Sequence, residues 1–347
     1  MANPTAPREG ASPLPVAGDV EAIDSLRGAA GRMREELGRV IIGQEGVIEQ
    51  LLVSIFGRGH ALLVGVPGLA KTLLVRSLAE AMSLEFNRIQ FTPDLMPSDI
   101  TGTDILQETD APGRRRFEYV KGPIFANVVL ADEINRAPPK TQSALLEAMQ
   151  EHRVTAAGHL YHLPAPFFVL ATQNPVEQEG TYPLPEAQLD RFMFLIHVGY
   201  PSAAEEGRIS RETTGGAAAG IEPVIGAEEL LRFQEVARRV PVPEHLHDFV
   251  VRLVRSSRPE APEAPAWIRE LVTWGAGPRA VQYLILGAKA RAALHGSYLA
   301  RMEDVEALAE PVLVHRILTS FHAESEGIGS REIIKRLLEE AHTKTRV

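Results

Sequence analysis

The sequence of 347 residues contains no cysteine, and only 6% of its residues are aromatic. Without cysteine the chain cannot form a disulfide, build a cysteine-ligated zinc site or use a thiol as a nucleophile. It has no apolar run near the roughly 20 residues that cross a bilayer, and its N-terminus lacks the apolar stretch of a signal peptide. We therefore expect a cytoplasmic protein without membrane insertion, whose core is packed mainly by aliphatic side chains.

Positive charge is also scarce, because 36 lysines and arginines stand against 45 aspartates and glutamates, a formal net charge of -9. An acidic chain is poorly suited to a broad phosphate-binding face, which argues against nucleic acid as a partner. The hydrophobic fraction of 45% and the charged fraction of 23% are ordinary for a globular protein and permit a sizeable core.

Composition divides the chain into four parts. Residues 1–19 carry Pro4, Pro7, Pro13 and Pro15 among Ala and Gly, which is typical of a disordered tail. We expect an α/β core at residues 20–200, a linker at 201–226 and a helical domain at 227–347. Within the linker, the Gly- and Ala-rich stretch Thr213–Gly220 is expected to be flexible.

The core is predicted from short apolar runs that alternate with helical periodicity. The strand candidates are Ala61–Val64, Asn87–Phe91, Val128–Ala131, Phe167–Ala171 and Phe192–Val198. Helical stretches such as Leu73–Met82 and Thr141–His152 lie between them, which favours a parallel sheet covered on both faces. Two further stretches, Ile100–Val120 around Asp110–Gly113 and Arg153–Leu163 around Ala157–Gly158, are predicted to be projecting hairpins.

After the linker we find helical patterns only. The helix candidates are Ala227–Arg239, Pro243–Ser256, Ala280–His295, Met302–Leu318 and Arg331–His342.

A phosphate-binding loop is predicted directly after the first strand. Its residues are Gly65, Val66, Pro67, Gly68, Leu69, Ala70, Lys71 and Thr72. Backbone N–H groups and a helix N-terminus suit phosphate, the Lys71 ammonium would neutralise it, and the Thr72 hydroxyl would join a Mg²⁺ shell. Ala70 stands where a second glycine is usual, and alanine resists positive φ. The alternative is a Gly/Pro turn that happens to precede Lys-Thr.

Two adjacent carboxylates, Asp132 and Glu133, end the apolar strand Val128–Ala131. Ligands of an open parallel sheet lie beyond the carboxyl ends of its strands, so Asp132 would meet a metal near Thr72 and Glu133 would polarise a water. Like charges this close repel one another, which a cation would relieve. The alternative is a solvent-exposed helix cap before Ile134.

Three polar residues are weaker candidates. Asn174 follows the fourth strand and could orient a water near a γ-phosphate, although an Asn-Pro turn is the simpler interpretation. Arg191 is expected to start the last strand, and Arg279 a helix of the second domain. Either could supply the additional guanidinium that phosphoryl transfer uses, or form an ordinary surface ion pair.

The segments GVPGLAKT, VVLADEINRA, ATQNP and LPEAQLDRF, in this order, resemble the MoxR family of AAA+ ATPases over about Val40 to Arg279. MoxR-like sequences also have alanine at the position of Ala70. The resemblance implies an α/β fold: a P-loop parallel-sheet AAA+ core with two hairpin insertions, followed by a small all-helical lid domain.

The resemblance also implies roles for individual residues. Lys71 and Thr72 match the Walker A motif, and Asp132 and Glu133 the Walker B pair, with Thr72 and Asp132 at the metal. Asn174 matches sensor 1, Arg191 the arginine finger and Arg279 sensor 2, and Arg136 is a rival for the finger. Nucleotide contacts are implied for Ile42, Gly43 and Gln44 near the adenine, and for the loop through Leu73.

The function implied is Mg²⁺-dependent ATP hydrolysis by a homo-oligomer, a hexameric ring, that remodels or matures proteins carrying von Willebrand factor A domains. Two alternatives stay open: a chelatase-type or DNA-associated AAA+ motor, and a non-hydrolysing nucleotide-gated scaffold. The basic run Arg114–Arg116 and the histidines His159 and His162 are interpreted as ordinary solvated hairpin residues.

Overall fold

The computed structural model describes residues 17–108, 115–156, 158–176, 180–215 and 220–345. The chain forms two compact units, one of Ala29–Arg232 and one of Met1–Gly28 together with Phe233–Val347. Two helices, α1 (Ala17–Val40) and α8 (Ala227–Arg239), continue from one unit into the other. Helix α1 thus begins inside the segment expected to be a tail, of which residues 1–16 lie outside the described residues.

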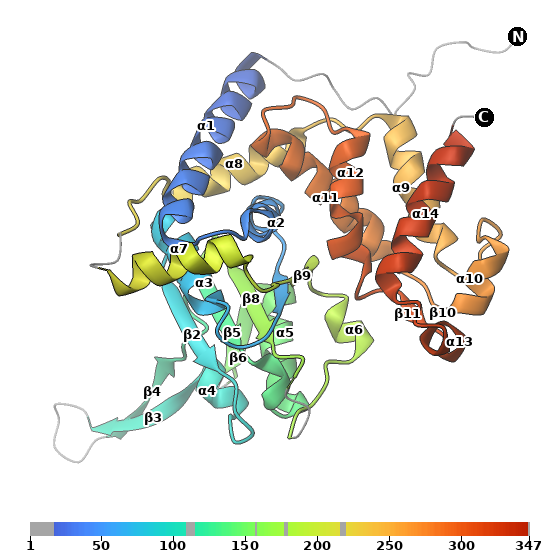
Figure 1. Cartoon of the computed structure of the whole chain (residues 1–347). Coiled ribbons are helices and arrows are strands. Elements are labelled where there is room, and N and C mark those ends of the chain that lie inside the picture. Colours follow the sequence, from blue (N-terminus) through green and yellow to red (C-terminus); the bar gives the residue numbers. More distant parts are fainter. Residues whose placement is uncertain (1–16, 109–114, 157, 177–179, 216–219, 346–347) are drawn as a thin grey trace, which may run out of the picture. The chain divides into compact units, whose positions relative to one another are not determined.

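A parallel sheet of five strands organises the first unit, as predicted (Figure 1). Its strand order is β2 (Phe86–Gln90), β5 (Val128–Asp132), β8 (Phe168–Gln173), β1 (Ala61–Val64) and β9 (Phe194–His197). All four neighbouring pairs are parallel, so the carboxyl ends of these strands lie at one edge of the sheet.

Both faces of the sheet are covered, which explains why its central strands are apolar over most of their length, before the polar residues at their carboxyl ends. Every residue of β5 is buried. Val129 packs in one cluster with Leu145 and Met149 of α5 (Pro139–Glu151), whereas the next residue along the strand points to the opposite face. Helix α3 (Lys71–Ala81) contacts β5, and α2 (Glu45–Phe56) contacts β9.

Two antiparallel hairpins are inserted into this unit, as predicted. The first pairs β3 (Gly102–Glu108) with β4 (Arg115–Lys121) and projects away from the sheet (Figure 1). The second pairs β6 (Arg153–Ala156) with β7 (His159–His162). The two are joined where the rings of Tyr119 and Tyr161 stack, with centroids 4.1 Å apart. The turn Asp110–Gly113 and Ala157 lie outside the described residues.

Shorter elements complete the first unit. They are α4 (Pro97–Thr101), the 3-10 helix η1 (Ile134–Arg136), α6 (Glu186–Leu189) and α7 (Ala203–Thr214). Helix α7 lies within the expected linker and begins with a capping box, in which Ser202 accepts from the Glu205 N–H and Glu205 accepts from the Ser202 N–H.

The second unit is predominantly helical. After α8 it contains α9 (Glu244–Ser256), α10 (Ala266–Leu271), α11 (Pro278–Leu294), α12 (Met302–Leu313), α13 (Phe321–Ser325) and α14 (Ser330–Thr345). A part-buried ion pair joins two of these helices, with 2.7 Å between Arg291 Nη1 and the Oδ1 of the buried Asp304. In the part of the chain that the structure describes, no helix is long and apolar enough to cross a membrane.

One difference from the sequence prediction lies in this unit. The expected helix Met302–Leu318 ends at Leu313, and the chain continues into β11 (Leu318–Thr319), which pairs antiparallel with β10 (Val272–Trp274). The expectation of helices alone omitted this pair, because strands of two and three residues are too short for a periodic pattern.

A buried histidine connects the sheet to α5. His60, just before β1, accepts at Nδ1 from the Val169 N–H at 3.0 Å, and its Nε2 lies 3.1 Å from the Met149 carbonyl oxygen. The ring must therefore be the neutral Nε2–H tautomer, which satisfies both contacts. Burial lowers the pKa of His60 from 6.5 to about 4.

We expect the stability of the protein to fall as pH drops from 6.5 to about 4, because the unfolded chain binds a proton at His60 that the folded chain refuses. At about 1.4 kcal/mol per pH unit, the contribution approaches about 3 kcal/mol at the lower end. Urea unfolding of the parent and of His60→Gln at several pH values measures it. The parent should lose its advantage over the variant on acidification, and parallel pH profiles would contradict this.

Candidate functional site

The loop between β1 and α3 is held at the carboxyl edge of the sheet. The Gly65 N–H donates to the carbonyl of Gln173, at the end of β8, at 3.3 Å. A Cβ on Gly65 would lie 2.6 Å from the Val198 carbonyl oxygen, so this position requires glycine. Gly68 adopts φ +86°, in the left-handed region that glycine tolerates.

Ala70 also adopts a left-handed conformation, at φ 55° and ψ 22°, and its carbonyl accepts the first helical hydrogen bond of α3 from the Leu74 N–H at 2.9 Å. Alanine pays roughly 1–2 kcal/mol there relative to a right-handed conformation. Ala70 therefore takes the backbone conformation that a glycine would have at this position, at the cost of local strain at the start of α3. The turn of the loop is preserved.

The Lys71 ammonium lies within the loop that precedes it. Nζ donates to the Gly65 carbonyl at 2.5 Å and to the Val66 carbonyl at 2.9 Å. Burial lowers the pKa of Lys71, whereas the nearby carboxylates of Asp132 and Glu133 oppose that shift. The structure therefore brings the lysine of the loop and the acidic pair close enough to interact electrostatically. Thr72 follows in the first turn of α3, half-buried.

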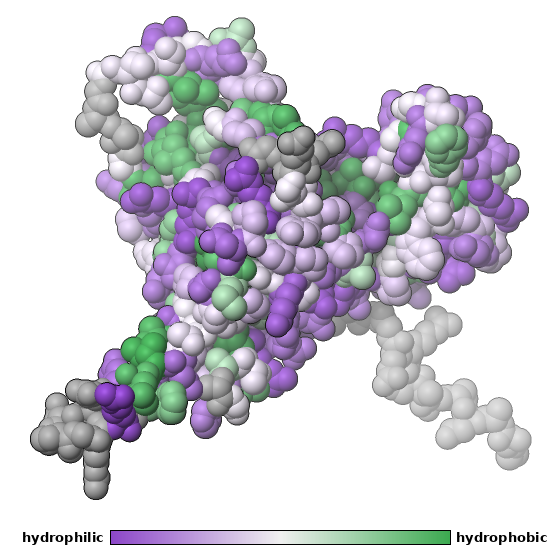
Figure 2. Space-filling view, turned by 90° about the horizontal axis from the view of Figure 1, so that it is seen from below, coloured by the Kyte–Doolittle hydropathy of each residue, from purple (hydrophilic) through white to green (hydrophobic). Residues whose placement is uncertain are grey.

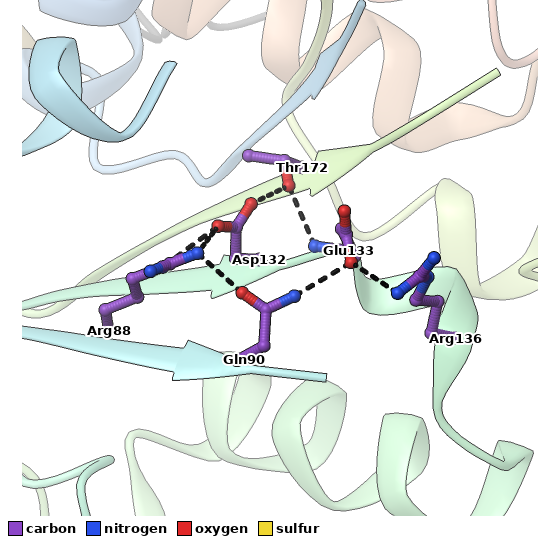
Figure 3. A network of polar contacts seen from close by, with 6 residues as sticks. All are labelled: Arg88, Gln90, Asp132, Glu133, Arg136 and Thr172. Atoms are coloured by element: carbon purple, nitrogen blue, oxygen red, sulfur yellow. Dashed lines mark hydrogen bonds and ion pairs between the residues drawn. The ribbon is translucent and has the colours of Figure 1, made fainter. Parts of the chain in front are cut away.

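The acidic pair lies at the end of β5 in a closed set of polar contacts (Figure 3). Asp132 is buried, and its Oδ1 accepts from the Thr172 hydroxyl at 2.5 Å. The same hydroxyl oxygen accepts from the Glu133 N–H at 2.8 Å, with Glu133 at φ 56°. Thr172 thus holds both residues, and the exposed-cap alternative does not describe Asp132.

Two residues of β2 that the sequence analysis overlooked complete this set. Arg88 donates to Asp132 Oδ2 from Nη2 at 2.6 Å and from Nε at 2.9 Å. Gln90 Nε2 donates to Glu133 Oε2 at 2.8 Å. Because Gln90 pairs with Asp132 in the parallel register, both β2 side chains lie on the face that carries the carboxylate. The sequence signal that could have identified them is the spacing of two polar residues, Arg88 and Gln90, at i and i+2 of the strand, which places both on one face.

Asn174 lies one residue beyond β8 and is buried. Its Oδ1 accepts from the Val176 N–H at 3.1 Å, which fixes the amide as in an Asn turn. Its Nδ2 has no hydrogen-bond partner among the described residues. A buried amide donor without a partner is costly, and it suits a site that receives a polar ligand.

The segment Ile42–Gln44 lies against the phosphate loop. Ile42 and Gly43 are buried, and Gln44 Nε2 donates to the Leu69 carbonyl at 3.4 Å. Gln44 Oε1 is buried and has no hydrogen-bond partner within the described part of the chain. Leu73 is 44% exposed beside this loop. The geometry therefore groups all the residues proposed for nucleotide contact on the first unit.

The arginine candidates fall in different places. Arg136 lies against the acidic pair, with Nη1 3.2 Å from Glu133 Oε2. Arg191 follows α6 and is half-buried, and its N–H donates to the Gln188 carbonyl. The expectation that Arg191 starts the last strand was wrong: β9 begins at Phe194, because the buried, apolar Phe192 belongs to the preceding turn. Arg279 is in the first turn of α11, in the other unit.

The residues present fit a magnesium nucleotide. Among the described residues no group of three or more His, Asp or Glu could hold a metal ion. Magnesium is usually bound by one or two carboxylates together with substrate phosphates, and Asp132 offers a carboxylate at the carboxyl end of β5. The loop supplies backbone N–H groups and one ammonium for the phosphates.

Comparisons with known proteins agree with this geometry. Residues 60–194 match the ATPase family associated with various cellular activities (AAA), and residues 265–337 match the AAA lid domain. The chain is 44% identical over 309 residues to Chaperone MoxR1 of Mycobacterium tuberculosis, covering 88% of this chain and 79% of that protein. Protein MoxR of Methylorubrum extorquens is 32% identical, covering 84% and 88%.

A solved structure is similar over most of its length. It is that of a candidate ATPase from Cytophaga hutchinsonii, with a TM-score of 0.85 and 42% sequence identity, covering 92% of this chain and 96% of that one. The parallel sheet, the phosphate loop and the helical lid together define an AAA+ ATPase. Within that class the chain belongs to the MoxR family.

Proposed function

We propose that the chain binds ATP with Mg²⁺ at the carboxyl edge of the sheet and hydrolyses it. The observation that supports this is the convergence of Lys71, the adjacent pair Asp132 and Glu133, and Asn174 at that edge, from three different parts of the chain. Membership of an ATPase family agrees with it. An intact Glu133 argues against a scaffold that binds nucleotide without hydrolysing it.

Each residue has a role that its position supports. Lys71, which donates to two loop carbonyls, exchanges them for phosphate oxygens when a nucleotide binds. Thr72 and Asp132 hold Mg²⁺, which neutralises phosphate charge when bound. Glu133 accepts the proton of the attacking water, and the unpartnered Nδ2 of Asn174 donates to that water or to the γ-phosphate.

Contacts with the rest of the nucleotide come from two segments. The backbone of Gly65–Ala70, with Leu73, surrounds the phosphates, and Ile42, Gly43 and Gln44 lie near the adenine. The buried Oε1 of Gln44, which lacks a partner within the described residues, is a suitable acceptor for the base.

We further propose that the protein acts as a hexameric ring in the cytoplasm, where Arg191 reaches the nucleotide of a neighbouring subunit and Arg279 completes the site from the lid. Family membership implies an AAA+ oligomer. An arginine placed at the γ-phosphate stabilises transition-state charge and is worth about 10³–10⁵ in rate. Arg136, which touches Glu133, is the rival for this role.

The ring is proposed to remodel protein partners, in particular proteins with von Willebrand factor A domains. One relative is named a chaperone. The β3–β4 hairpin exposes apolar side chains on strands of high β-propensity: Ile105 (38%), Leu106 (51%), Phe117 (72%) and Val120 (45%). Figure 2 shows this apolar surface on the projecting hairpin. Such exposed apolar surface is typical of a protein-binding site.

Two substitutions test the hydrolytic site. Glu133→Gln keeps the shape of the side chain but removes the base, so we expect ATP turnover to fall about 10²-fold or more while nucleotide binding persists. Lys71→Ala should lose nucleotide binding itself, because the phosphates lose their ammonium. Phosphate release and binding of a fluorescent nucleotide measure the two effects. Turnover at the parent rate in Glu133→Gln would overturn the role of Glu133.

Mixed rings test the arginine in trans. Arg191→Ala and Glu133→Gln subunits should each be inactive alone, but a mixture restores sites that combine an intact Glu133 with a neighbour's Arg191. At equal proportions about a quarter of the subunit interfaces are complete, so we expect activity to return in that proportion. Full activity of Arg191→Ala alone would exclude Arg191 as the finger. A mixture of Arg136→Ala and Glu133→Gln subunits tests in the same way whether Arg136 is the arginine that acts in trans.

The partner class is tested by capture. Glu133→Gln should hold the ATP-bound assembly, so affinity purification with ATP followed by mass spectrometry is expected to enrich a protein with a von Willebrand factor A domain. Lys71→Ala, which should not reach the ATP-bound state, is the matched control. Equal recovery with both variants, or recovery of no such protein, would contradict the partner proposal.

A further inference from the structure

The side chain of Gln142 lies between the acidic pair and the segment that carries Arg191. Gln142 is near the start of α5 and is buried. Its Nε2 donates to the Ile134 carbonyl at 3.2 Å and to the Tyr182 carbonyl at 3.0 Å. Ile134 is the residue directly after Glu133. Tyr182 begins the stretch that leads to Arg191.

The amide of Gln142 can take only one orientation here. Its nitrogen faces two carbonyl oxygens, and turning the amide over would set its own oxygen against both. The Oε1 atom is buried and has no hydrogen-bond partner among the described residues. A buried acceptor without a partner is unfavourable. The amide at this position is therefore required by the two carbonyls that Nε2 holds, and not by the surroundings of its oxygen.

The backbone of Tyr182 is held at both of its polar groups. Its N–H donates to the Asn135 carbonyl at 2.6 Å, and its carbonyl accepts from Gln142. Ile134 and Asn135 are buried residues of η1, the short helix that follows Glu133. Because η1 contacts Tyr182 directly and through Gln142, a shift of η1 moves the backbone of Tyr182 with it.

The stretch from Tyr182 to Arg191 is short and stiff. Pro183 and Pro185 each have a fixed φ. Leu184, between them, is buried in the core cluster, and α6 begins directly after Pro185. A displacement of Tyr182 is therefore transmitted to the backbone of Arg191, because the intervening residues have little freedom to absorb it.

We propose that Gln142 is a positioning residue that serves two nucleotide sites at once. Through Ile134 it fixes Glu133, the base of its own subunit. Through Tyr182 it fixes Arg191, the arginine offered to the neighbouring subunit. This inference rests on the proposed function, which supplies both roles. Within one subunit it gives a continuous hydrogen-bonded path from the site that the subunit binds to the site that it completes.

A single substitution tests the positioning role. Gln142→Met keeps the length of the side chain and removes both donors. We expect ATP turnover to fall about 10- to 100-fold, because the base and the arginine both lose their position, while the affinity for a fluorescent ADP analogue stays within about twofold of the parent. Gln150→Met, at an exposed position of the same helix, is the matched control and should change neither quantity.

Turnover at the parent rate in Gln142→Met would overturn the positioning role. A loss of nucleotide affinity as large as the loss of turnover would also overturn it, because general disruption of the site lowers both together.

Rings mixed with parent subunits test the double role. A Glu133→Gln subunit inactivates only its own site, and an Arg191→Ala subunit only that of its neighbour, so at equal proportions with the parent each leaves about half of the sites complete. A Gln142→Met subunit should inactivate both, which leaves about a quarter. Phosphate release is compared in the three mixtures at one total concentration, with light scattering to verify the mixed rings.

About half of the parent activity in the Gln142→Met mixture would overturn the double role, because the residue would then serve one site only. If Gln142→Met subunits do not join parent rings, Gln142→Leu, which also removes both donors, takes their place. Full activity in the Glu133→Gln or Arg191→Ala mixture would instead contradict the proposed function. The failure of this inference and that of the proposed function are therefore distinguishable.

Discussion

Parallel hydrogen bonding between β1, β8 and β5 brings the ends of three strands, far apart in sequence, to one edge of the sheet. The phosphate loop leaves from β1, Asn174 follows β8, and the acidic pair ends β5. The Gly65 N–H bond to the Gln173 carbonyl extends this pairing into the loop itself. Without the register, Lys71 would not lie in the field of Asp132 and Glu133, and no common site for a phosphate and a metal would exist.

The site contains backbone conformations and buried polar atoms that are unfavourable in a region with a purely structural role. Ala70 and Glu133 both adopt positive φ, which for residues other than glycine is locally unfavourable. Asn174 and Gln44 each bury a polar atom that finds no partner in the described ranges. A nucleotide that supplies the missing hydrogen bonds would account for the two unpartnered atoms. Strained backbone conformations cluster at ligand-binding sites, so both features are consistent with one ligand.

How much of the fold and of the candidate site could be predicted from the sequence depends on how far apart in the sequence the interacting residues lie. The core strands were predicted within one or two residues, because most of them are short apolar runs, as expected for parallel strands buried on both faces; β2, with its polar Arg88 and Gln90, is the exception. The loop was predicted because its spacing is local. The contacts of Arg88 and Gln90 were not, because they require knowing that β2 lies beside β5, and sequence periodicity does not give lateral strand order. The β10–β11 pair was not predicted, because its strands are too short to give a periodic pattern. The left-handed conformation of Ala70 was not predicted either, because alanine rarely adopts that conformation.

A crystal structure of the Glu133→Gln protein with ATP and Mg²⁺ tests the central claim most directly. The account predicts a metal between the Thr72 hydroxyl and Asp132, and a Lys71 ammonium that has moved from the Gly65 and Val66 carbonyls to the phosphates. Triphosphate bound away from the Gly65–Thr72 loop, or a Lys71 ammonium still on those carbonyls beside bound nucleotide, would contradict it.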